Sequence, residues 1–261
     1  MRVTFCGVRG STPVAGPEFA RTGGHTSCLA ISRGDARPTL VLDAGTGLQQ
    51  LARAFAGEPF RGTIVLTHLH WDHVQGLPFF PPADRDDAEV TLVQPAQGDP
   101  VATLSRAMSP PHFPIGPEGL RGSWKHIGIE PGVHDFEGFE VTAREVVHKG
   151  GRAYGYRVRD GDATFAYVPD ALDENDDAIC ELARDVDVLI RGTPFVATES
   201  DRAAAFGHGT VEHAVEIAAR AGARQLVLTH HGPMRVDDDV DAIAARAGVT
   251  AAREGLALDI V

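Results

Sequence analysis

The sequence has few of the residues that build disulfide scaffolds or membrane spans. Its 261 residues include only three cysteines, two tryptophans and three tyrosines. Because the cysteines are odd in number and widely spaced, a disulfide framework or a cysteine-based zinc ribbon is not expected. No apolar run approaches the length of a transmembrane helix, and the first residues lack a signal-peptide pattern. We therefore expect a cytoplasmic protein.

Positive charge is also in short supply. Twenty-four lysines and arginines against 36 acidic residues give a formal net charge of −12 at pH 7. A field of this sign repels polyanions, so we expect no long nucleic acid and no membrane as partner. A small anionic substrate is still compatible with this charge if bound cations hold it.

The chain is 43% hydrophobic, which is enough for one core, and we expect a single domain over residues 1–261. Short runs rich in β-branched residues predict strands, and helical spacing of apolar residues predicts helices. Strands are expected at residues 2–6, 28–32, 39–42, 63–67, 89–93, 138–147, 153–159, 163–168, 186–191 and 225–229, and helices at 48–56, 176–184, 210–221 and 237–246. This order favours an α/β (α+β) fold with two sheets packed face to face and helices outside.

The segment 77–132 differs from the rest because it contains nine prolines around one strand-like run. Such a composition predicts a segment that is mostly loop. Since it directly follows a histidine cluster, it either walls a site or forms a solvent-facing insertion.

Four potential metal ligands lie within six residues at the end of the predicted strand 63–67. His68 and His70 are two residues apart and can reach one ion, whereas a turn after them can direct Asp72 and His73 at a second. Imidazoles and a carboxylate are the ligands expected for zinc or a similar divalent ion. The cluster therefore predicts a metal centre.

This motif resembles the signature of the metallo-β-lactamase superfamily. That resemblance implies a four-layer αββα sandwich with one or two metal ions at its edge. It extends along nearly the whole chain, because Asp43, His148, Asp170 and His230 each follow an apolar run in the order that the family uses. Taken alone, His148 and His230 would more often be polar caps than ligands, and Asp170 could simply start a helix.

The resemblance also implies a role for each site residue. One ion is expected on His68, His70 and His148 and the other on Asp72, His73 and His230, with Asp170 bridging them. Asp43 is expected to brace the site by hydrogen bonds. Zinc is the default for both ions, and manganese, iron and nickel suit the same ligands. The two ions would share a hydroxide that attacks the substrate, with Asp72 counted among the catalytic residues.

A second motif, from Phe206 to Thr210, precedes a predicted helix. It resembles the Gly-His-Ser-Thr motif of the phosphodiesterase branch, which contains ribonuclease Z and the phosphoribosyl cyclic phosphodiesterases, except that Gly209 replaces the serine. The resemblance implies that His208 donates a hydrogen bond or a proton to the phosphoryl or leaving oxygen. The alternative is a plain helix entry capped by Thr210.

The N-terminal segment 7–13 and the segment 23–28 are also similar to the cyclic phosphodiesterase branch. In these segments Arg9 faces either the substrate or the solvent at a turn, and His25 occupies a position where Asn is common. Trp71, between the ligands, is expected to be a packing residue.

The expected activity is hydrolysis of a small, cyclic nucleotide-like phosphodiester. Residues 148–170 have room for two strands and a turn but not for the arm with which ribonuclease Z grips transfer RNA. His70 argues against the diiron oxygen reductases, which generally have Glu there. A ribonuclease Z-like endonuclease and a carboxyl ester, thioester or lactam hydrolase are the alternatives, followed by a metal-binding module without catalysis. A homodimer is expected only from the general frequency of dimers.

Overall fold

Two sheets form the centre of the computed structural model, which describes residues 1–173 and 176–261. Within these residues each sheet has seven strands. The first has the order β14-β1-β2-β3-β4-β5-β6, with β14 at Ala257–Asp259, β1 at Arg2–Gly7, β2 at Cys28–Ser32, β3 at Leu40–Leu42, β4 at Arg61–Val65, β5 at Glu89–Pro95 and β6 at Ser123–Ile129. The second has the order β13-β12-β11-β10-β9-β8-β7, with β13 at Thr250–Ala251, β12 at Gln225–Thr229, β11 at Val188–Gly192, β10 at Ala163–Val168, β9 at Ala153–Asp160, β8 at Phe139–Val146 and β7 at Gly132–Phe136.

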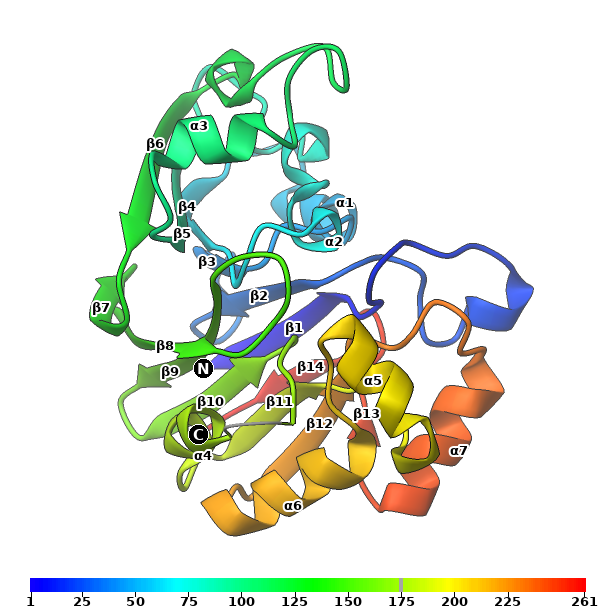
Figure 1. The fold of residues 1–261 in the computed structure, drawn as a ribbon. Coiled ribbons are helices and arrows are strands. Elements are labelled where there is room, and N and C mark those ends of the chain that lie inside the picture. Colours follow the sequence, from blue (N-terminus) through cyan, green and yellow to red (C-terminus); the bar gives the residue numbers. More distant parts are fainter. Residues whose placement is uncertain (174–175) are drawn as a thin grey trace.

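Helices cover the outer faces of both sheets (Figure 1). The α-helices are α1 Leu48–Leu51, α2 Trp71–Val74, α3 Pro100–Ser105, α4 Asp177–Ala183, α5 Ser200–Phe206, α6 Val211–Ala221 and α7 Asp237–Ala247, and the 3₁₀ helices are η1 Pro17–Phe19, η2 Ala52–Phe55, η3 Leu77–Phe79, η4 Pro117–Gly119 and η5 Ala197–Glu199. None of the helices in the described residues is long and apolar enough to cross a membrane.

Three apolar clusters separate the layers. The central one joins the two sheets and includes Phe5 and Val65 from the first and Phe139, Tyr156 and Phe165 from the second, all fully buried. A second cluster packs α1 and η2 onto the first sheet, and a third packs α4 and α6 onto the other. Burying each large side chain contributes about 1.5 to 3 kcal/mol before entropy is counted. The predicted αββα layering is therefore confirmed.

The predicted elements are confirmed with shifted ends, but the segment 77–132 is more regular than expected. It contains β6 and α3 as well as the expected β5, so the prediction of loop was wrong for residues 123–129 and 100–105. Strand β6 is a sheet edge whose sequence mixes polar and apolar residues, and it is ordered by pairing with β5. The helix expected at 48–56 is α1 continued by η2, and α5 was not predicted.

The site lies where several strands end at one edge of the sandwich. Strands β3 and β4 are parallel neighbours in the first sheet, and β10, β11 and β12 are parallel neighbours in the second. Strand β8 runs in the direction of β10, because both are antiparallel to β9. Their carboxyl ends therefore face the same edge, and side chains just beyond them can meet.

Candidate metal centre

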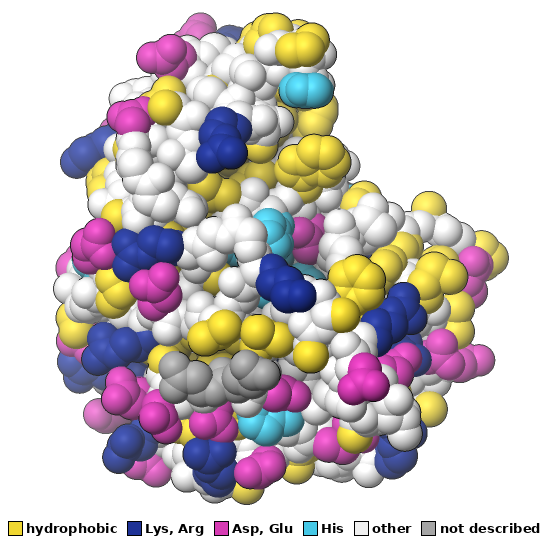
Figure 2. Space-filling model, in the orientation of Figure 1, with side chains coloured by type: hydrophobic (Ala, Val, Ile, Leu, Met, Phe, Trp, Pro, Cys, Tyr) yellow, Lys and Arg dark blue, Asp and Glu magenta, His cyan; other side chains and the backbone are white. Residues whose placement is uncertain are grey.

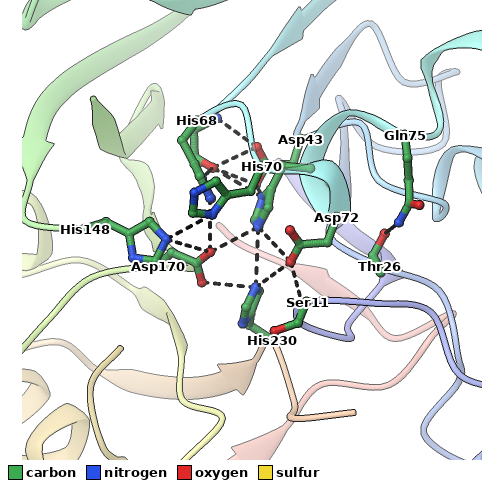
Figure 3. A network of polar contacts seen from close by, with 12 residues as sticks. Ser11, Thr26, Asp43, His68, His70, Asp72, Gln75, His148, Asp170 and His230 are labelled. Atoms are coloured by element: carbon green, nitrogen blue, oxygen red, sulfur yellow. Dashed lines mark hydrogen bonds and ion pairs between the residues drawn. The ribbon is translucent and has the colours of Figure 1, made fainter. Parts of the chain in front are cut away.

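The structure gathers the predicted ligands into two groups that share Asp170. The first group consists of His68, His70, His148 and Asp170, and one ligand atom from each lies within 4.8 Å of the others. His68 and His70 follow β4, His148 follows β8 and Asp170 follows β10. Figure 3 shows these four side chains pointing toward one another.

The second group consists of Asp72, His73, Asp170 and His230, under the same 4.8 Å limit. Asp72 and His73 lie on the single turn of α2, and His230 follows β12. His230 has a φ of 55°, in the left-handed region that non-glycine residues seldom occupy. This conformation ends the strand and turns the imidazole toward Asp170 (Figure 3).

The spacing of the ligand atoms suits a metal ion. Asp170 Oδ2 lies 3.3 Å from His68 Nε2 and 3.2 Å from His73 Nε2, and Asp170 Oδ1 lies 3.1 Å from His230 Nε2. Ligands at zinc bond lengths and tetrahedral angles are about 3.3 Å apart. Asp170 therefore offers a carboxylate oxygen to each group, with Oδ2 close to His68 and His73 and Oδ1 close to His230.

Hydrogen bonds on the outer ring nitrogens leave the inner ones free. His73 Nδ1 is 2.8 Å from Asp43 Oδ2, and His148 Nδ1 is 2.7 Å from the Gly207 carbonyl oxygen, so each Nδ1 donates a proton outward. The opposite nitrogens then point lone pairs at the centre. In the described part of the chain, the buried His68 Nε2 has no hydrogen-bond partner, which is the condition expected of a metal ligand.

Asp43 holds the ligand histidines in place by hydrogen bonds, as predicted. Its carboxylate accepts hydrogen bonds from Thr67 N at 2.8 Å and from the Tyr167 hydroxyl at 2.9 Å, in addition to the contact with His73. Asp43 is fully buried and has a φ of 63°. Thr67 Oγ1 in turn lies 3.1 Å from His68 Nδ1, so Asp43 orients ligands in both groups.

The electrostatics of the site favour bound cations. Burial lowers the pKa of His68 and of His70, so both imidazoles are neutral and available as ligands at neutral pH. Burial also opposes a charge on His73, yet the carboxylates of Asp43 and Asp72 raise the pKa of His73 well above its ordinary value. Without a metal ion, these carboxylates therefore favour a protonated, positively charged His73. A bound metal ion can supply that positive charge instead.

The N-terminal segment supports the second group from the solvent side. Ser11 N donates to Asp72 Oδ2 at 2.6 Å. Gly10 passes so close to His230 that a Cβ there would lie 2.2 Å from its Nδ1, and this contact requires glycine. Arg9 is fully buried and donates to the carbonyls of Gly23 and Arg235, so it faces neither substrate nor solvent.

A cavity of about 850 Å³ opens beside both groups and is lined by His70, Asp72, His148, Asp170 and His230. Figure 2 shows histidine side chains at the bottom of the hollow, with hydrophobic side chains along its rim.

The predicted catalytic His208 also lines this cavity. Its Nδ1 is 3.5 Å from Asp170 Oδ1. Burial lowers the pKa of His208 to about 4, against the opposing effect of the Asp170 carboxylate. Trp71 lines the cavity too and is 73% exposed, so its prediction as a packing residue was wrong.

The structure accounts for the glycine that departs from the Gly-His-Ser-Thr motif. A Cβ on Gly209 would lie 2.0 Å from Asp173 Oδ1. The Asp173 carboxylate accepts from Thr210 N at 3.0 Å and lies 2.6 Å from His213 Nδ1. Asp173 was not predicted, because no motif connects it with residues far along the chain. Thr210 does cap α6, so the cap and a site role for His208 coexist.

A family described as a Beta-lactamase superfamily domain matches residues 39–231, which include all seven predicted metal ligands. The chain belongs to this family. It is 25% identical over 265 residues to a ribonuclease Z of Exiguobacterium sibiricum, covering 77% of this chain and 81% of that protein.

Solved structures confirm the fold. The metallo-beta-lactamase fold protein YhfI from Bacillus subtilis is 23% identical, with a TM-score of 0.75 and 99% of each chain covered. A diphosphatase from the PhnP family is 19% identical, with a TM-score of 0.70, covering 99% of this chain and 97% of that one.

Proposed function

We propose that this chain hydrolyses the phosphodiester bond of a small, nucleotide-like substrate with two divalent metal ions, zinc by default. The observation that carries the proposal is the position of Asp170. Its carboxylate is shared by both ligand groups and lies 3.5 Å from His208 at the wall of an open cavity. The relationship to ribonuclease Z supports a phosphodiester over other substrates.

The chemistry divides between the ions and the side chains. When bound by the two ligand groups, divalent ions would supply a nucleophile from water at neutral pH and would stabilise the oxygens that gain charge. Asp72, Asp170 and Asp43 supply three buried carboxylates that offset the charge of these ions. His208 has a pKa of about 4 and is therefore neutral at pH 7, so it donates a hydrogen bond to a phosphoryl oxygen and not a full proton.

Two features support a small substrate. The net charge of −12 disfavours a long polyanion. Strands β9 and β10 fill most of the chain between His148 and Asp170 and are joined by a short turn, which leaves no extended arm to grip RNA. Cleavage of RNA is the second candidate, favoured by the similarity to a ribonuclease Z. The cytoplasmic location, the single domain and the homodimer stay predictions.

The test compares hydrolysis of bis-p-nitrophenyl phosphate with that of p-nitrophenyl acetate, a chromogenic lactam and a transfer RNA precursor, using zinc-loaded protein. His208→Ala is measured beside the wild type, and His112→Ala serves as control because His112 is an exposed histidine outside the site. Losing one donor to a developing anion lowers turnover by about 100- to 1,000-fold.

The expected result is phosphodiester turnover that falls in His208→Ala, stays in His112→Ala and is accompanied by equal zinc content in all three proteins. Hydrolysis of the ester or the lactam without the phosphodiester would refute the proposal. Cleavage of the RNA precursor alone would replace the small substrate with RNA.

A further inference from the structure

One wall of the cavity carries an aromatic pair with an arginine on it. Phe195 and Phe206 lie in parallel, with ring centroids 6.4 Å apart and an interplanar angle of 11°. Phe206 ends α5 and is 59% exposed. Phe195 is fixed by its backbone, because its carbonyl accepts from Val211 N at 3.0 Å.

The guanidinium of Arg202 lies over both rings. Its Cζ is 5.7 Å from the centroid of Phe195 and 5.9 Å from that of Phe206. Contact with two aromatic faces holds a guanidinium in place while its N–H groups stay free to bind. Arg202, a residue of α5, is therefore oriented before any ligand arrives.

Arg202 differs from the other arginine that lines the cavity. Arg235 is paired with the carboxylate of Glu199, which cancels its charge. No acidic side chain among residues 1–173 and 176–261 forms an ion pair or a hydrogen bond with Arg202. The cavity wall thus has one positive charge that the described residues leave uncompensated.

Phe195 lies between Arg202 and the side chains at the proposed reaction site. The ring of Phe195 lies 6.0 Å from that of His208, whose ring lies 5.3 Å from that of His230. One molecule can therefore place a phosphodiester at His208 and a second anionic group at Arg202. A guanidinium binds such a group best when it has two oxygens to receive its paired N–H donors.

We propose that Arg202 is a specificity-determining residue that binds a second anionic group, a phosphate monoester, on the substrate. This inference rests on the proposed function and narrows its substrate class to phosphodiesters that carry a further phosphate. The aromatic pair beneath Arg202 presents an apolar surface to the part of the substrate that links the two phosphates.

Two chromogenic substrates that differ in one phosphate test the inference. They are thymidine 5′-(p-nitrophenyl phosphate) and the same compound with a 3′-phosphate. A charge-assisted contact is worth roughly a 10- to 100-fold preference in kcat/KM for the second compound, expressed mainly in KM. Arg202→Gln should abolish this preference, because kcat/KM for the second compound falls by the same factor relative to the first.

Two further variants separate charge from geometry. Arg202→Lys keeps the charge but loses the paired donors, and it should retain only part of the preference. Arg246→Gln removes an exposed arginine of α7 and should keep all of it. Equal kcat/KM for the two compounds in the wild type, or an unchanged preference in Arg202→Gln, would overturn the inference while the proposed function stands.

A binding measurement keeps the two proposals apart. If neither compound is hydrolysed, the proposed function fails, and calorimetry then compares thymidine 3′,5′-bisphosphate with thymidine 5′-phosphate on the zinc-loaded protein. Tighter binding of the bisphosphate that disappears in Arg202→Gln supports the anion site by itself. Equal binding of the two ligands rejects it.

Discussion

The two ligand groups around Asp170 differ in burial and composition. In the first, His70 and His148 are half-buried and three imidazoles accompany one carboxylate. In the second, all four residues are buried and two carboxylates accompany two imidazoles. The second group also receives Ser11 N and Asp43 as partners. In the proposed two-ion centre, an ion in the second group would therefore be held more deeply than one in the first, which would exchange with solvent at the cavity.

Removing one histidine from either group is expected to have the largest effect on metal content and turnover. His148→Ala should leave the second group loaded and release the ion of the first, whereas His230→Ala should disturb the buried ion. Phosphodiester turnover should fall more than about 100-fold in both variants. Loss of a residue that only hydrogen-bonds to a metal ligand already lowers activity by up to about 100-fold, and loss of the ligand itself should cost more. Metal analysis after dialysis checks the difference, and equal metal content in the two variants would contradict it.

A smaller effect is expected from Asp43→Asn. An amide has only one acceptor oxygen, so it cannot accept from Thr67 N on one side and from His73 and Tyr167 on the other, as the two carboxylate oxygens do. Metal affinity of the second group should therefore fall about 10- to 100-fold. Tyr167→Phe removes a single hydrogen bond to the same carboxylate and should change the affinity by less. Zinc competition with a chromogenic chelator measures both, and a larger loss in Tyr167→Phe would argue against the bracing role.

The smallest effect is expected from Gly209→Ser, which places a side chain against Asp173. Overpacking of this kind costs about 1 to 3 kcal/mol of unfolding free energy. Because the same loop carries the Gly207 carbonyl that orients His148, the first group should weaken and the second should not. Denaturant unfolding of Gly209→Ser with and without Asp173→Ala checks this, since the double variant should recover stability.

The sequence predicted the parts of the site that depend on local order. His68 and His70 were predicted from their spacing after one strand, whereas Asp170 and His230 were predicted from their order along the chain in the family that it resembles. The edge strand β6 was missed because its mixed sequence has no apolar run and is ordered by pairing with β5.

Contacts between residues that are far apart along the chain could not be predicted from the sequence. Arg9 is buried because carbonyls of Gly23 and Arg235 receive its guanidinium, and Asp173 matters because Gly209 leaves room for it. Neither contact has a periodicity or a motif that reveals it along the chain.

The most direct test of the account is a zinc titration of metal-free protein, following bound zinc and hydrolysis of bis-p-nitrophenyl phosphate together. The account predicts little turnover while the buried group fills and a steep rise as the second ion binds. Full turnover without zinc, or no turnover with both groups loaded, would contradict it.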